Sequence, residues 1–219
     1  MSASSASDTD RDGVDVNIEM RQAWRRHVAN DDALFERVVG RHREKHRRYH
    51  GVAHVAGVVG LVVELGAIET TDDLDAVVAA AFYHDAIYEP ASPANERASA
   101  RLAVRDLTTL GWSDEPVAHV STMIEATVDH REPPDLDHAV LFDADLATLG
   151  ADPADYSTYV QAVRAEYRHV DDGAWRDGRR RVLESFLERA AIYATVTGRD
   201  RWESSARSNI ALEFASLTR

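Results

Sequence analysis

Apolar residues recur at helical spacing along nearly the whole chain, and this pattern restricts the possible folds more than any other feature. Tyr156 lies three and four residues before Tyr159 and Val160, which in turn lie four and three residues before Val163. Residues at these spacings share one face of an α-helix. The sequence shows no strand-like alternation and no Asn-Gly hairpin signal. We therefore predict one all-α domain of about ten helices.

Capping residues, prolines and glycines divide the pattern into separate helices. A Ser- and Asp-rich segment without a run of apolar residues precedes them, and we expect a disordered tail over residues 1–13 and the helical domain over 14–219. We expect helices near residues 17–30, 32–46, 50–66, 71–84, 92–110, 113–130, 136–149, 152–170, 175–187 and 201–217.

Composition excludes several classes of protein. Among 219 residues, 44% are hydrophobic and 29% charged, as in ordinary globular proteins, and no run of about 18 apolar residues predicts a membrane span. The absence of cysteine excludes disulfides and thiolate metal sites. A net charge of −13 disfavours a nucleic acid polymer as partner, since that requires a basic surface. Without a signal sequence, the expected location is the cytoplasm.

One basic run, residues 41–50, stands out in this acidic chain. It contains four arginines and one lysine, and it comes directly before a predicted helix. Two interpretations stay open from the sequence: a solvated helix end, or a mouth that attracts an anionic substrate to a neighbouring site.

Histidine and aspartate occupy positions where an apolar side chain is expected. His84 and Asp85 lie seven residues after Val77 and Val78, so both continue an apolar helix face. His54 likewise shares the face of an apolar helix, and Asp145 follows the apolar pair 141–142 at three and four residues. A buried carboxylate without a partner is costly. Four such residues on three helices are better explained by one shared site than by four separate structural roles.

Two imidazoles and two carboxylates suit a divalent metal ion. Mn²⁺, Fe²⁺, Mg²⁺, Co²⁺ and Ni²⁺ fit such a donor set, and Zn²⁺ also fits, although less diagnostically without thiolates. Four protein ligands leave positions open for water and a substrate oxygen on a six-coordinate ion. We therefore predict His54, His84, Asp85 and Asp145 as ligands of one metal ion.

The order His54, then His84-Asp85, then Asp145 resembles the H…HD…D signature of the HD-domain superfamily of metal-dependent phosphohydrolases. Over about residues 20–215, longer matches resemble an uncharacterised bacterial branch of predicted HD phosphohydrolases. One departure is Gly51, where that branch has Asn. The matching segments are Tyr49-His50-x-x-x-His54, Phe82-Tyr83-His84-Asp85-Ala86-Ile87-Tyr88, Asn95-Glu96-x-x-Ser99-Ala100, Ala126-Thr127-x-x-His130, Asp143-Ala144-Asp145-Leu146-x-x-Leu149-Gly150, Arg164-x-Glu166-Tyr167 and Ala206-Arg207-x-Asn209.

The resemblance implies a single HD-type helical domain, an enzyme, and the four metal ligands named above. It also implies that Asp85 orients the attacking water. Around the metal we predict His50 and Glu96 as further catalytic residues, because both types exchange protons. We also predict three substrate-binding residues, for each of which a purely structural role, such as a helix cap, an ion pair or a place in the core, stays open: His130, Arg164 and Tyr167.

The predicted function is hydrolysis of a phosphate ester or anhydride in a small molecule, with a nucleotide as the expected substrate, by water activated on the metal. The alternative is a non-catalytic metal- or nucleotide-binding module that regulates a partner. A helical protein with no site fits less well, because the polar residues cluster. The sequence leaves open the metal, the substrate and whether the chain forms an oligomer.

Overall fold

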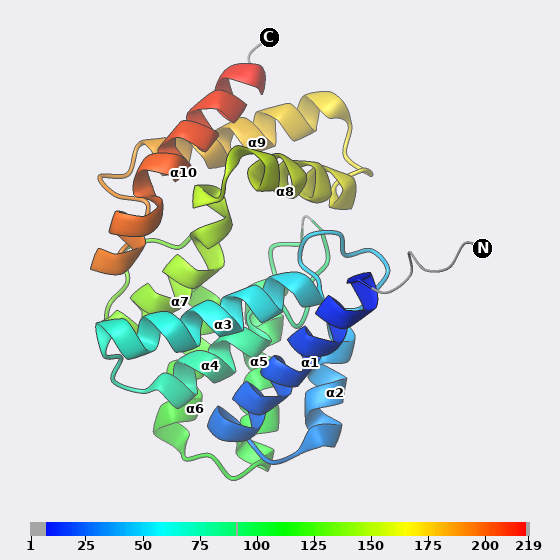
Figure 1. Ribbon diagram of the computed structural model, residues 1–219, viewed down its shortest axis with the longest axis vertical. Coiled ribbons are helices and arrows are strands. Elements are labelled where there is room, and N and C mark those ends of the chain that lie inside the picture. Colours follow the sequence, from blue (N-terminus) through cyan, green and yellow to red (C-terminus); the bar gives the residue numbers. More distant parts are fainter. Residues whose placement is uncertain (1–7, 91, 218–219) are drawn as a thin grey trace, which may run out of the picture.

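The described part of the chain contains ten α-helices and one short 3₁₀-helix, which confirms the predicted all-α fold (Figure 1). The computed structural model describes residues 8–90 and 92–217, and this part of the chain contains no strand. The elements are α1 (Asp8–His27), α2 (Asp32–Arg41), α3 (Val52–Glu69), α4 (Leu74–Tyr83), α5 (Asn95–Thr109), α6 (Asp114–Ala126), α7 (Leu136–Leu146), the 3₁₀-helix (Ala147–Gly150), α8 (Pro153–Glu166), α9 (Asp172–Leu187) and α10 (Val196–Leu217).

The N-terminal boundary differs from the one expected. Residues 1–7 lie outside the described part, but α1 begins at Asp8, so it overlaps the tail that we predicted over residues 1–13. Aspartates in this segment favour a helix start, because the helix dipole stabilises negative charge near its N-terminus. We placed the start of this helix near residue 17 from the apolar pattern alone, and that pattern does not include the effect of charge.

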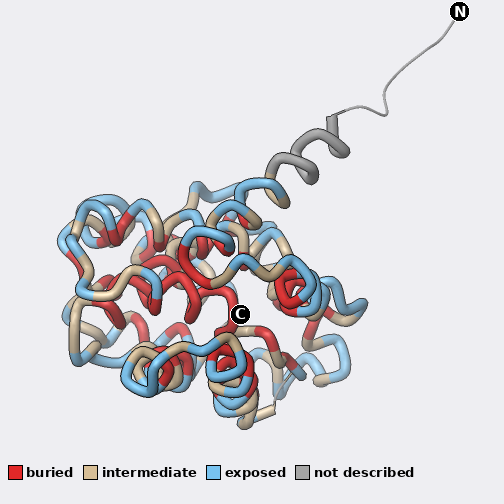
Figure 2. The backbone as a smooth tube through the Cα atoms, turned by 90° about the horizontal axis from the view of Figure 1, so that it is seen from below, coloured by how far each residue is buried: buried red, intermediate tan, exposed pale blue. Residues whose placement is uncertain are grey.

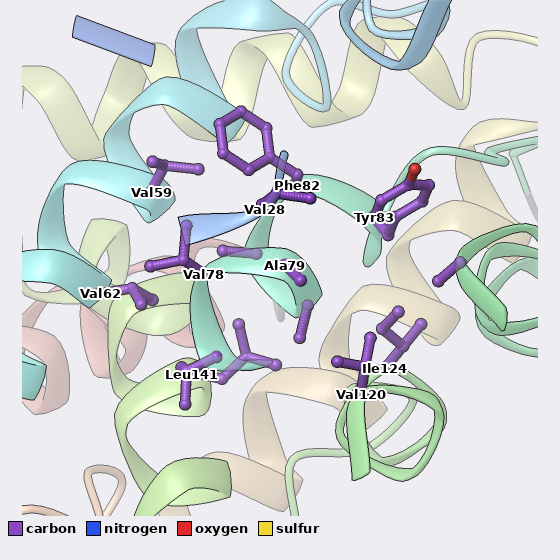
Figure 3. Packing of buried hydrophobic residues seen from close by; sticks show 14 of the residues in the cluster. Val28, Val59, Val62, Val78, Ala79, Phe82, Tyr83, Val120, Ile124 and Leu141 are labelled. Carbon is purple, nitrogen blue, oxygen red and sulfur yellow. The ribbon is translucent and has the colours of Figure 1, made fainter. Parts of the chain in front are cut away.

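Helix α4 is the central element of the larger of two hydrophobic clusters. Its residues from Ala76 to Tyr83 are all buried, and the side chain of the N-cap Asp73 accepts a hydrogen bond from the Ala76 amide. Side chains of α3, α6 and α7 surround it (Figure 3). Because α4 is buried all round, its last turn delivers the next two residues, His84 and Asp85, into the interior of the molecule.

Helix α3 is long and apolar enough to cross a membrane, judged by length and composition alone. Its mean hydropathy is 1.7, and 33% of the segment is buried here. This finding amends our expectation that the sequence holds no such segment. In the fold, α3 packs against α1, α4 and α7, and Val59 and Val62 face α4 (Figure 3). These contacts account for one apolar face of α3.

The last three helices form a second packing unit at one end of the molecule (Figure 1). Their apolar residues, with Leu146 and Leu149, make a smaller hydrophobic cluster, and the buried stretches face inward in both units (Figure 2). Helix α7 joins the units, because the buried Asp143 accepts hydrogen bonds from the amides of Ala194 and Thr195 at 2.7 and 2.8 Å. A Cβ at Gly198 would lie 2.2 Å from Asp143 Oδ2, so this approach requires glycine.

The basic run forms turns rather than a helix end. Arg47 is 5% exposed, and its guanidinium donates hydrogen bonds to the carbonyls of His50, Asp85 and Ala86. It therefore fixes the segment after α2 against the end of α4. Arg47 is therefore neither part of a solvated helix end nor free to attract an anion, because its guanidinium is bound inside the protein. Residues 42–46 and 50–51, which we expected to be helical, are not helical.

Candidate metal centre

The four predicted ligands come together at one point, and we call them the His-Asp cluster: His54, His84, Asp85 and Asp145. The two Nε2 atoms of His54 and His84 are 3.2 Å apart. Asp85 Oδ2 lies 3.5 Å from the first and 3.3 Å from the second. Asp145 Oδ1 lies 3.2 and 3.6 Å from the same atoms. The donors thus converge although the sequence spreads them over 92 positions (54 to 145).

Three helices position the cluster. His54 lies in the first turn of α3, His84 is the C-cap of α4 with Asp85 beside it, and Asp145 lies in the last turn of α7. His84 Nδ1 contacts the Ala81 carbonyl at 2.9 Å, so Nδ1 is the donor there. This hydrogen bond leaves the Nε2 lone pair of His84 directed at the cluster, as in metal-binding histidines.

The donor set fits a divalent metal ion. Ligands about 2.0–2.2 Å from one ion lie about 3.0–3.5 Å from each other, and most separations in the cluster fall in this range. One donor atom each of His54, His84 and Asp85 lies within 4.8 Å of the others, so these three residues could hold an ion. Side-chain exposures of 2–18% make the site nearly closed, with the carboxylates most accessible. The residues can therefore hold a metal ion.

Without a metal, the charges of the cluster balance one another. Burial opposes ionisation, but His84, His50 and His54 together hold the pKa of Asp85 well below its ordinary range. Asp145 behaves likewise through His84, His130 and His54. Conversely, burial favours neutral imidazoles, yet the two carboxylates raise the pKa of His54, and that of His84 well above 6.5. Protons on the imidazoles supply the positive charge that a metal would otherwise supply.

Metal affinity is expected to rise with pH, because a metal must displace these protons. The raised pKa values of His54 and His84 stabilise the metal-free protein below the unfolded value of 6.5, and this contribution is lost as pH rises through the folded values. Mn²⁺ should therefore raise the melting temperature more at about pH 8.5 than at about pH 6. Thermal unfolding with and without Mn²⁺ measures this, and an equal increase at both pH values would contradict it.

His130 contacts a ligand of the cluster directly. Its Nε2 lies 2.8 Å from Asp145 Oδ2, and its positive φ of 46° turns the chain at the end of α6 so that the ring reaches back. Asp145 therefore keeps its other oxygen, Oδ1, toward His54 and His84. His130 therefore orients Asp145, and because it also lines the larger cavity, the substrate-binding role that we predicted for it stays a prediction.

A buried glutamate that we did not predict holds His50. Glu166 has a fully buried side chain, and its Oε1 accepts hydrogen bonds from the amides of residues 48, 49 and 50. Its Oε2 accepts from His50 Nδ1 at 2.7 Å and from the Tyr88 hydroxyl at 2.8 Å. Burial by itself would raise the pKa of Glu166, but these hydrogen bonds and the charge of His50 lower it to about 2. Glu166 is therefore a carboxylate, and His50 Nδ1 carries a proton.

Two cavities border the cluster. The larger has a volume of about 930 Å³ and lies between the cluster and helices α8 and α9; His50, His130 and Asp145 form its inner wall. Its outer wall is largely aromatic, with Tyr159, Tyr167, Trp175 and Phe186. A smaller cavity of about 520 Å³ reaches His54 and Asp145 from the side of α3. The larger cavity thus has room for a molecule much larger than phosphate beside Asp145.

The remaining predicted residues differ in their outcome. Tyr167 lines the larger cavity, as a substrate-binding residue must. Arg164 does not line it, because its guanidinium donates to the carbonyls of Tyr167 and Val170 and pairs with Asp172. Arg164 connects α8 to α9 in this way, and the substrate-binding role predicted for it stays a prediction. Glu96 is half-buried in the first turn of α5 and lines neither cavity at the cluster, so its catalytic role stays a prediction.

Comparisons of the chain with models of known protein families, with curated proteins and with solved structures gave no match. The interpretation of the site therefore depends on its geometry and on the resemblance of its residues to the HD signature.

Proposed function

We propose that the chain is a metal-dependent phosphohydrolase of the HD type, which cleaves a phosphate ester or anhydride of a small molecule. The observation that carries the proposal is the convergence of His54, His84, Asp85 and Asp145 on one point beside a large cavity. When bound, the metal supplies Lewis-acid activation of water and of the phosphoryl group. The same donor order in the HD signature supports this class of reaction.

His50 is the group that exchanges a proton with the substrate in this proposal. It lines the cavity next to Asp145, and its Nδ1 proton is bound to Glu166, so the opposite ring nitrogen is the one available. Stacking on Tyr88, with ring centroids 4.3 Å apart, fixes the plane of the imidazole. A histidine held in this way can protonate the oxygen of the leaving group. Asp85 is left to orient the water that attacks phosphorus.

The cavity supports a substrate with a sizeable organic part. Pockets for small-molecule ligands have volumes of about 300–1,000 Å³, and about 930 Å³ lies at the upper end. Its aromatic wall suits a planar ring, because rings stack on Tyr and Trp. The charge of Arg179 is neutralised by Glu213 at 2.7 Å, so it does not hold a phosphate. A nucleotide, with its base against the aromatic wall, meets these requirements.

A panel assay tests the proposed function. Nucleotides and simple phosphate esters should be incubated with the protein and Mn²⁺, Mg²⁺, Co²⁺ or Ni²⁺, and phosphate release should be measured. We expect release that depends on the metal and stops with a chelator. Metal binding without any product would instead favour the alternative, a non-catalytic module that regulates a partner.

A further inference from the structure

A second group of metal-ligand side chains lies outside the proposed active site, and we call it the α6–α7 cluster: His119, Asp135 and His138. One donor atom of each residue lies within 4.8 Å of the others. His119 belongs to α6, Asp135 is the N-cap of α7, and His138 lies in the first turn of α7. Seven residues of α7 separate His138 from Asp145, which corresponds to about 10 Å along the helix axis. The two clusters are therefore separate sites.

Carboxylates hold both imidazoles of this cluster. His119 Nε2 lies 3.0 Å from Asp137 Oδ2, and the buried Asp137 is itself fixed by the amides of Asp72 and Asp73. His138 Nδ1 lies 2.7 Å from Asp135 Oδ1. Histidines that bind metals typically have one ring nitrogen bound to a carboxylate, which sets the ring and leaves the other nitrogen for the ion. His119 has this arrangement through Asp137, whereas the contact between His138 and Asp135 joins two of the proposed ligands, 2.7 Å apart, which is close enough for both to bind one ion.

The exposure of the residues allows an ion to enter. The side chains of His119 and Asp135 are 26% and 37% exposed, whereas that of His138 is 4% exposed. The ring centroids of the two histidines are 5.3 Å apart. The Asp135 carboxylate contacts the amide and Nδ1 of His138 through Oδ1, which leaves Oδ2 for another partner. The cluster therefore offers two nitrogens and one oxygen as ligands, with His138 buried and the other two side chains open to solvent.

We infer that the α6–α7 cluster is a second metal site, specific for borderline ions such as Zn²⁺ or Co²⁺. Two imidazoles and a carboxylate favour these ions over Ca²⁺ or Mg²⁺, which need a shell of oxygens. The bound ion joins the start of α7 to α6, and Asp137 connects both to the start of α4. The role of this ion is to stabilise the helices that support the proposed active site. The inference of a second metal site does not depend on the proposed reaction.

Replacing His119 by alanine tests this inference, because His119 is partly exposed and its loss leaves the core intact. After removal of bound metal with a chelator, the full chain is titrated with Co²⁺ by calorimetry and visible absorption. His119→Ala should bind one equivalent fewer than the wild type. The same loss should occur when His119→Ala is added to Asp85→Ala. Zn²⁺ should also raise the melting temperature of Asp85→Ala but not that of the double variant.

The matched control is His169→Ala, which removes an exposed histidine outside both clusters and should leave the Co²⁺ stoichiometry unchanged. Circular dichroism confirms that each variant is folded. If His119→Ala binds as many equivalents as the wild type, the inference is wrong, whatever the panel assay gives. If His119→Ala loses its equivalent but no substrate is cleaved, the second site stands and the proposed function fails.

Discussion

The variant Asp85→Ala is expected to lose metal binding and phosphohydrolase activity together. Asp85 lies within 3.5 Å of both imidazoles of the His-Asp cluster, so its removal takes away one of four donors. We expect kcat/KM to fall by at least about 10³-fold, because ligands that act as a unit are not replaced by their neighbours. The metal-free variant should also be less stable at neutral pH, since the lowered pKa of Asp85 means that the fold favours its ionised form.

Calorimetric titration with Mn²⁺, phosphate release and thermal unfolding measure metal binding, activity and stability. Asp85→Asn, which keeps the shape of the side chain, separates the loss of charge from the loss of packing. Asp177→Ala removes an exposed carboxylate on α9 and should match the wild type in all three measurements. An Asp85→Ala variant with wild-type turnover would remove this residue from the mechanism.

The pair Glu166 and His50 should act as one unit. Glu166→Gln and His50→Gln are each expected to lower kcat by about 100-fold, and the double variant should be little worse than either. The reason is that Glu166 positions the ring of His50 through the 2.7 Å hydrogen bond and cannot act without it. Metal stoichiometry should stay unchanged in all three variants, because neither residue is a predicted ligand.

Stability provides a second measurement on the same variants. Glu166→Gln should lower the free energy of unfolding by about 2–4 kcal/mol at pH 7, because buried donors lose a charged acceptor. The folded pKa of about 2 lies below the ordinary value of 4.5, so the contribution is present above pH 4.5 and is lost as pH falls toward 2. Denaturant unfolding at about pH 7 and pH 3 should show the difference shrinking. Glu184→Gln, an exposed change on α9, is the control, and additive effects on kcat would contradict the positioning role.

The sequence predicts the metal donors because their signal is local. His84 and Asp85 interrupt the apolar pattern of α4, and Asp145 interrupts that of α7, so each residue is conspicuous on its own helix. The same periodicity predicts the helices themselves. Their convergence at 3.2–3.6 Å follows from the packing of α3, α4 and α7 against one another, and only the structure gives that distance.

The residues that the sequence misplaces are those with distant backbone partners. Glu166 accepts hydrogen bonds from amides 116 to 118 positions away, and no local sequence pattern predicts such contacts. Arg47 likewise binds carbonyls 38 and 39 positions ahead, which converts a predicted helix end into turns. The sequence likewise does not show that the Arg164 guanidinium donates to the carbonyls of Tyr167 and Val170, which follow α8.

The division of the molecule into two packing units has an evolutionary consequence. The donors of the His-Asp cluster belong to α3, α4 and α7, whereas α8 and α9 supply most of the aromatic wall of the cavity. The units are joined through α7, where Asp143 binds the amides before α10. Substitutions such as those at Val163, Trp175 or Val182 can therefore reshape the wall without moving a donor. Proteins with this fold can therefore change the molecule that they bind in the course of evolution while the four donors stay the same.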